Sequence, residues 1–193
     1  MTAMPSLETE RLLIRPFGLE DLDACRRVMD GGPSPDRPTR SARRRWLRWT
    51  VLSYGELAAL RQPPYGDRAI VLKDTGAVVG AVGFVPSLMP FGQLPSFRAD
   101  APGTADRLSF PEVGLFWTLA PEHRGHGYAT EAAAALIGYG FRELRLRRIV
   151  ATTSYDNVAS MAVMRRLGMR IDRNPHPDPR WLQVVGVLDH PPV

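Results

Sequence analysis

A glycine-rich turn in the second half of the chain has the residue types of a phosphate-binding site. It consists of Arg124, Gly125, His126, Gly127, Tyr128, Ala129 and Thr130. An apolar stretch that predicts a strand precedes it, and a stretch with helical periodicity follows. The first N–H groups of a helix lack partners within the helix, and the helix dipole adds positive charge there. Since glycine has no side chain to keep a phosphate oxygen away, we predict an anion site, with a plain strand-to-helix connection as the alternative.

Two other phosphate-binding motifs do not fit this turn. A P-loop needs a lysine followed by serine or threonine after its last glycine, whereas Lys73 is the only lysine and lies far away in sequence. A dinucleotide-binding fingerprint needs three spaced glycines in an early β-α-β unit, and this turn comes late with two. We therefore expect a different phosphorylated ligand.

The composition is that of an ordinary globular protein. Of the 193 residues, 44% are hydrophobic and 23% are charged, which predicts a single domain over residues 1–193. No apolar run reaches the roughly 20 residues that cross a bilayer, and the first residues lack the pattern of a signal peptide. We expect a cytoplasmic protein that does not contact a membrane.

Metal binding is not expected. Cys25 is the only cysteine, so it cannot belong to a cysteine cluster or an internal disulfide. The histidines lack the four-residue spacing at which two ligands on a helix bind one metal ion; they are His123, His126, His176 and His190.

The order of apolar and polar residues predicts a mixed α/β fold. Strands are expected at residues 11–17, 69–72, 78–85, 112–119, 148–153 and 181–188, and helices at 19–29, 39–60, 128–144 and 158–167. The strands at 69–72 and 78–85 should form a hairpin around a turn that contains Gly76. Residues 86–110 are rich in Pro, Gly, Ser and Asp, so we predict a long mobile loop that can serve as a lid.

Arginines are concentrated in residues 37–48, where apolar residues recur at helical spacing. We interpret this segment as an amphipathic helix with a solvated basic face, the alternative being a surface for an anionic partner. Nucleic acid is not the expected partner despite the net charge of +5. The large aromatic residues Trp46, Trp49 and Trp181 are predicted to belong to the core, although they could also line a pocket.

Several of these motifs resemble one family. The residues from Arg124 to Ala129 match the Arg/Gln-x-x-Gly-x-Gly/Ala motif of the GNAT superfamily of acyl-CoA-dependent N-acyltransferases. Residues 130–132 resemble its branch of ribosomal-protein N-terminal acetyltransferases. Residues 7–16 are similar to the opening strand of that branch, and residues 157–160 and 166–169 to its second CoA-side helix.

The resemblance implies a fold and a cofactor. The fold would be a mixed, mostly antiparallel sheet, splayed at the strand 112–119 and flanked by about four helices. Acetyl-CoA would bind with its pyrophosphate on residues 124–130 and its pantetheine arm along the backbone of Trp117, Thr118 and Leu119. Asn157 and Ser160 would also contact CoA, although Asn157 could simply cap its helix. A homodimer is common in the family.

The reaction would be direct transfer of an acetyl group to a primary amine, either a protein N-terminus or a small molecule. We choose Glu112 as the base, acting through water, with a surface acid as the alternative. The tyrosine that often serves as acid is replaced by Met164, so we choose Ser160, whose alternative is a helix serine bonded to its own backbone. This replacement also keeps open a catalytically silent sensor that binds acyl-CoA.

Overall fold

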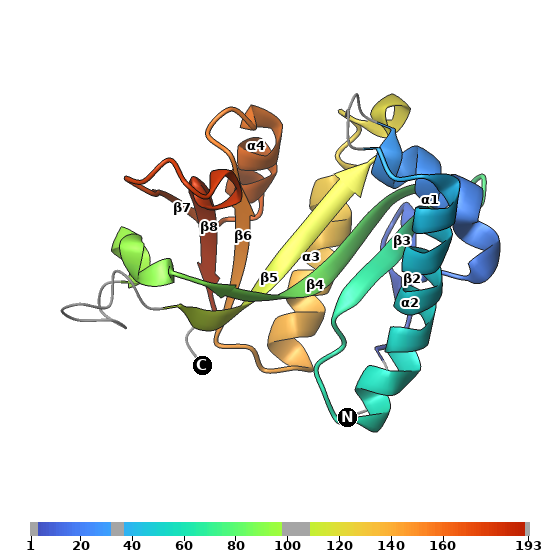
Figure 1. Cartoon of the computed structure of the whole chain (residues 1–193), viewed down its shortest axis with the longest axis horizontal. Helices are drawn as coiled ribbons and strands as arrows, with labels where there is room; N and C mark the ends of the chain where they lie inside the picture. The colour runs from blue at the N-terminus through green and yellow to red at the C-terminus, as the bar shows by residue number, and fades with distance from the viewer. Residues whose placement is uncertain (1–3, 32–36, 98–108, 192–193) are drawn as a thin grey trace. The chain divides into compact units, whose positions relative to one another are not determined.

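The structure, a computed structural model, describes residues 4–31, 37–97 and 109–191 (Figure 1). Within these ranges the α-helices are α1 (Leu22–Asp30), α2 (Arg40–Ala59), α3 (Tyr128–Arg142) and α4 (Val158–Arg166). The strands are β1 (Leu7–Glu8), β2 (Leu12–Pro16), β3 (Gly66–Leu72), β4 (Val78–Met89), β5 (Phe110–Leu119), β6 (Arg148–Thr153), β7 (Arg170–Arg173) and β8 (Val184–Asp189). Each of the four predicted helices is present, and so is the β3–β4 hairpin, in which Gly76 has a φ of +70°.

The strands form one sheet in the order β1-β2-β3-β4-β5-β6-β8-β7. The pairs β1–β2, β2–β3, β3–β4, β6–β8 and β7–β8 are antiparallel, whereas β5 and β6 are parallel and pair at Gly114 and Val150. This confirms the mixed, mostly antiparallel sheet.

The chain divides into two compact units, one of Met1–Phe84 and Phe116–Gly138 and one of Val85–Leu115 and Tyr139–Val193. The splay predicted beside β5 concerns both units and stays a prediction.

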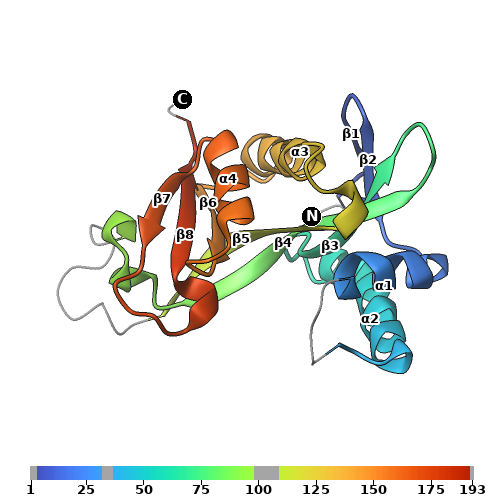
Figure 2. The same cartoon turned by 90° about the horizontal axis from the view of Figure 1, so that it is seen from above.

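In the first unit, helices α1 and α2 cover one face of β2, β3 and β4, and α3 lies on the other face (Figure 2). The core beneath α1 and α2 contains Phe17, Leu22, Cys25, Val28, Leu47, Ala69, Val71, Ala81 and Ala120. Burial raises the pKa of the Cys25 thiol to about 11. This cysteine therefore stays protonated at neutral pH and packs as a small apolar side chain.

Helix α2 is the predicted basic helix. Its N-cap is Thr39, whose hydroxyl accepts a hydrogen bond from the Ala42 N–H at 3.2 Å. Its exposed arginines confirm the solvated basic face: Arg40, Arg44, Arg45 and Arg48. Arg43 is the exception, because it is buried and pairs with Asp30.

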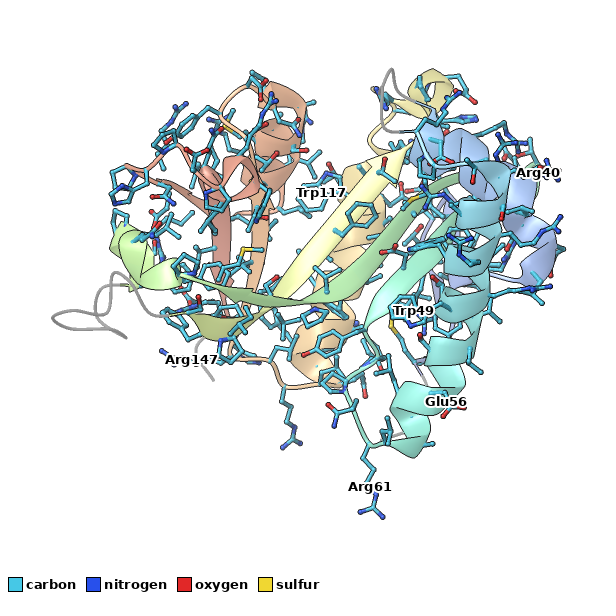
Figure 3. All side chains as sticks on the ribbon, viewed as in Figure 1. Arg40, Trp49, Glu56, Arg61, Trp117 and Arg147 are labelled. Carbon is cyan, nitrogen blue, oxygen red and sulfur yellow. The ribbon has the colours of Figure 1, made fainter. Side chains whose placement is uncertain are left out.

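The predicted core position of the large aromatic residues is correct for Trp46 only. Trp46 packs edge-on against Phe17, with ring centroids 6.3 Å apart. Trp49 on α2 (Figure 3) and Trp181 are each 62% exposed, so their assignment to the core was wrong. Helical spacing shows that residues share a helix, but it does not show which face the sheet covers.

In the second unit, the prediction of a loop over residues 86–110 was wrong for much of its length. Strand β4 continues to Met89, and two short 3-10 helices follow at Phe91–Gln93 and Pro95–Phe97. Phe91 and Phe97 are fully buried and stack with ring centroids 5.0 Å apart. With the β6 and β8 side chains they form the core of this unit. The rest of the predicted lid, residues 98–108, lies outside the described residues.

No helix in the described part of the chain is long and apolar enough to cross a membrane.

Candidate functional site

The glycine turn lies in the first unit, between the end of β5 and the start of α3. Gly125 and Gly127 have φ angles of +82° and +83°, a conformation that residues with a side chain rarely adopt. A Cβ on Gly125 would meet nothing within 4 Å. Glycine is therefore required at these positions by backbone conformation, and the space beside Gly125 is open.

A row of backbone N–H groups lacks acceptors at this turn. The Arg124 N–H donates to the Pro121 carbonyl at 3.3 Å, and the Glu131 N–H donates to the Gly127 carbonyl at 3.0 Å. Between them, the N–H groups of residues 125–130 donate to no described residue. Residues 124–127 are exposed. Free donors at a helix start, where the dipole is positive, form an anion site.

Two residues of the N-terminal segment, Thr9 and Arg11, hold the start of α3 through Glu131, and we call these three residues the clamp. The Glu131 carboxylate accepts hydrogen bonds from the Thr9 hydroxyl at 2.6 Å and from the Arg11 N–H and Nε at 3.0 and 2.7 Å. Partial burial raises the pKa of Glu131, but these hydrogen bonds and the charge of Arg11 outweigh it and hold the pKa below its usual value. Glu131 is therefore ionised at neutral pH and ties α3 to the β1–β2 connection.

Arg11 also contacts the turn itself. Its Nη1 donates to the His126 carbonyl at 3.1 Å, and its guanidinium lies 4.7 Å from the centroid of the Tyr128 ring. The His126 ring stacks on Tyr128, with centroids 5.6 Å apart. A Cβ on Gly127 would lie 3.4 Å from Arg11 Nη2. These contacts fix the direction in which the free N–H groups point.

The turn is also tied to the strand before it. Arg124 Nε donates to the Leu119 carbonyl at 3.2 Å, and the Ala120 N–H donates to the Val79 carbonyl at 3.0 Å. Leu119 is buried, whereas Trp117 and Thr118 are partly exposed. The structure therefore brings the predicted pantetheine segment and the predicted pyrophosphate turn together within one unit.

Asn157 and Ser160 lie in the second unit, at the start of α4. Asn157 is the N-cap, and its side-chain oxygen accepts from the Ser160 N–H at 3.1 Å. This hydrogen bond gives Asn157 a structural role, whatever else it contacts. The Ser160 hydroxyl bonds to no described residue, so the back-bonded helix serine is not observed. Met164 is fully buried, with Gly186 beside its sulfur.

Glu112 also lies in the second unit, near the start of β5. Its carboxylate pairs with Arg148 at 3.2 Å, and Arg148 also contacts Asp189 at 2.8 Å. The Glu112 side chain is 13% exposed, so it is not the surface acid of the alternative interpretation.

Among the described residues, no group of three or more His, Cys, Asp or Glu side chains could hold a metal ion.

The sequence interpretation missed the clamp formed by Thr9, Arg11 and Glu131. A signal was present, since these residues fall in the two segments that carry the family resemblance, but nothing in the sequence indicated that the segments touch.

A strand, a glycine turn with free N–H groups and a helix define a protein that binds a phosphorylated cofactor. Residues 11–170 match the family model described as the acetyltransferase (GNAT) domain. An uncharacterized N-acetyltransferase of Bacillus subtilis (strain 168), YnaD, is 29% identical over 168 residues, which cover 85% of this chain and 82% of the relative. The chain belongs to the GNAT acetyltransferase family, and acetyl-CoA is its co-substrate.

Solved structures agree with this assignment. An acetyltransferase from Agrobacterium tumefaciens str. C58 has 28% identity and a TM-score of 0.66, covering 97% of this chain and 96% of that one. The ribosomal L7/L12 alpha-N-protein acetyltransferase RimL in complex with coenzyme A has 15% identity and a TM-score of 0.62, covering 95% and 97%. At that identity, RimL supports the fold alone.

Proposed function

We propose that this protein transfers an acetyl group from acetyl-CoA directly to a primary amine, with the CoA pyrophosphate held by residues 124–130. The free N–H groups of residues 125–130 carry this proposal. A pyrophosphate is a compact dianion that can accept several of these hydrogen bonds at once. The open space beside Gly125 leaves room for it.

The pantetheine arm would then lie along the backbone of Trp117, Thr118 and Leu119. The amine nitrogen attacks the thioester carbonyl carbon, a C–N bond forms, and collapse of the tetrahedral intermediate breaks the C–S bond. The amine must lose one proton and the CoA thiolate must gain one. Placing the two reactants side by side supplies much of the rate in such a transfer.

We assign the proton transfers to two residues of the second unit. Glu112 is the proposed base, which takes the amine proton through water while it stays in its ion pair with Arg148. Ser160 is the proposed acid, which protonates the thiolate and recovers its proton from solvent. Its hydroxyl has no hydrogen bond to a described residue, which leaves it free for this role. Asn157 is proposed to contact CoA in addition to its capping role.

The phosphate turn is tested by Gly127→Val with Gly76→Val as its matched control. Both glycines have positive φ, +83° and +70°, so valine strains the backbone in a similar way at both positions. Gly76 lies in the β3–β4 hairpin turn and is not part of residues 124–130. Calorimetric titration with CoA should show a large loss of affinity for Gly127→Val and none for Gly76→Val. Equal affinities in the two variants would contradict the assignment.

Turnover is tested by thiol release from acetyl-CoA over a panel of small amines and N-terminal peptides. We expect release that depends on the acceptor. Tight CoA binding without release for any acceptor would instead identify a protein that binds acyl-CoA without catalysis.

A further inference from the structure

Helix α2 presents two large apolar side chains to solvent. Helix α2 lies at the outside of the first unit (Figure 2), and on it Trp49 is 62% exposed and Leu52 is 63% exposed. The side of α2 that packs on its own unit buries Arg43, Leu47 and Thr50. At about 100° per residue, Trp49 and Leu52 lie on the opposite side of the helix. Large apolar side chains that are adjacent on one exposed face indicate a surface that contacts another molecule.

These two residues belong to a regular row along α2. Arg45, Trp49, Leu52, Glu56 and Ala59 are all exposed and follow one another at alternating intervals of four and three residues. This is the spacing with which one helix packs lengthwise against another. We call these five residues the α2 seam. Its centre is apolar, a cation lies on one side of the centre, and an anion lies on the other.

The two charges of the α2 seam are not paired within the chain. Neither Arg45 nor Glu56 forms an ion pair or a side-chain hydrogen bond with a described residue. They are 11 residues apart in the sequence, which is about 16 Å along the helix, so they do not reach each other in one copy. A partner for this face therefore needs an anion opposite Arg45, a cation opposite Glu56 and apolar side chains between them.

A second copy of α2 meets this requirement when the two helices run antiparallel. With Trp49 of one copy opposite Leu52 of the other, two-fold symmetry repeats the same contact with the copies exchanged. Arg45 lies four residues before Trp49, and Glu56 lies four residues after Leu52. The same register therefore places Arg45 of each copy opposite Glu56 of the other. A parallel pair would instead place arginine against arginine and glutamate against glutamate.

The other exposed arginines of α2 lie outside the α2 seam. Arg40 pairs with Asp23 at 2.6 Å. Arg44 and Arg48 lie on one flank of the row and are exposed, so solvent and salt weaken their repulsion between two copies. Arg48 is the nearer of the two, and in the antiparallel register it comes close to Gly55 of the other copy. A Cβ on Gly55 would meet nothing within 4 Å, so this position has room for a long side chain.

We infer that the α2 seam binds the α2 seam of a second copy of this chain in antiparallel orientation, which forms a symmetric homodimer. Two contacts between Trp49 and Leu52 form its centre, and two ion pairs between Arg45 and Glu56 lie on either side. The inference does not rest on the proposed function, because no residue of the α2 seam belongs to the cofactor turn. One helix from each copy makes a small interface, so we expect a dissociation constant in the micromolar range.

The test is sedimentation equilibrium of the free chain over about 5 to 200 µM. Wild type should change from monomer to dimer over this range. Arg45→Glu and Glu56→Arg should each raise the dissociation constant at least about tenfold, because each places like charges together on both sides of the centre. Trp49→Ala should weaken the dimer to a similar extent, since it removes the central apolar contact. Arg44→Glu is the matched control, because it makes the same change of charge on the flank, and it should shift the dissociation constant by less than about twofold.

An equimolar mixture of Arg45→Glu and Glu56→Arg is the most specific sample. In a mixed pair, one copy has acids at both charged positions and the other has arginines at both, so every contact joins opposite charges. The mixture should therefore dimerise with a dissociation constant within about threefold of wild type, whereas each variant alone stays monomeric. The double variant that carries both substitutions should also recover self-association.

Wild type that stays monomeric at about 200 µM would overturn the inference and leave the α2 seam to a different protein. A dimer that persists in Arg45→Glu and Trp49→Ala would also overturn it, because another surface would then form the dimer. So would an equal loss in Arg44→Glu, which would indicate a general effect of charge. The substituted residues are exposed, so the melting temperature of each variant at about 2 µM should equal that of wild type. With that control met, a mixture that does not associate would contradict the proposed register.

Discussion

Replacing Asp67 with asparagine should stabilise the protein at neutral pH and have a much smaller effect near pH 4. In the folded protein, the pKa of Asp67 is raised from its usual 3.8 to about 6, first because burial removes water from the carboxylate. A group whose pKa is higher in the folded state binds its proton more tightly there. It contributes stability below pH 3.8 that is lost as the pH rises to about 6.

The size of this effect follows from the two pKa values. Each pKa unit corresponds to about 1.36 kcal/mol, so the rise from 3.8 to about 6 costs up to about 3 kcal/mol above pH 7. Asparagine has nearly the same shape and no charge, so the variant avoids this cost. The difference in unfolding free energy between Asp67→Asn and wild type should therefore grow by about 2 to 3 kcal/mol from pH 4 to pH 7.5.

Urea denaturation of both proteins at several pH values measures this difference. Asp74→Asn serves as control, because it removes the same charge from an exposed position. A stability difference for Asp67→Asn that stays constant between pH 4 and pH 7.5 would refute the reasoning.

Three further substitutions, one of them with a control variant, test other parts of the structure. Arg11→Ala should lower CoA affinity by about tenfold in a calorimetric titration because it loosens the turn, while Arg48→Ala, which removes an exposed arginine of α2, should not. Equal affinities would contradict the clamp. Asn157→Ala should lower the unfolding free energy by about 1 kcal/mol in urea, since it removes a helix cap; an unchanged value would rule out that role. Gly83→Val should destabilise the protein by at least about 1 to 3 kcal/mol, because its Cβ would overlap the Gly66 carbonyl oxygen, and an unchanged melting temperature would argue against this packing.

Much of the fold could be predicted because local signals and tertiary structure agree. The helix expected at residues 39–60 is α2, whose bounds follow from the Thr39 cap and from helical spacing. The β3–β4 hairpin follows from two apolar runs around Gly76. Residues 86–110 were different, because their Pro, Gly and Ser content suggested a loop. Phe91, Leu94 and Phe97 recur every three residues there, and this period was the missed sign of 3-10 turns with one buried side.

The candidate site was predictable only where its residues are consecutive. The glycine turn could be predicted from its residue types alone, because few positions outside such turns require two glycines so close together. Arg11 and Glu131 are separated by 120 residues, and a single sequence does not show which of its many opposite charges meet. Asp67 resembled any polar residue at a strand end. Its raised pKa comes from burial, which is a property of the folded chain alone.

The clamp on the glycine turn has a consequence for how this protein folds. Thr9 and Arg11 reach Glu131 across 122 and 120 residues of chain. Closing a loop of that length costs entropy that no local contact repays, so contacts of this range tend to form late. A partly folded chain can therefore contain the β3–β4 hairpin and still lack an ordered cofactor turn. In the proposed function, acetyl-CoA binds a turn that is completed late, so during refolding it should act by holding the completed state rather than by speeding the early collapse.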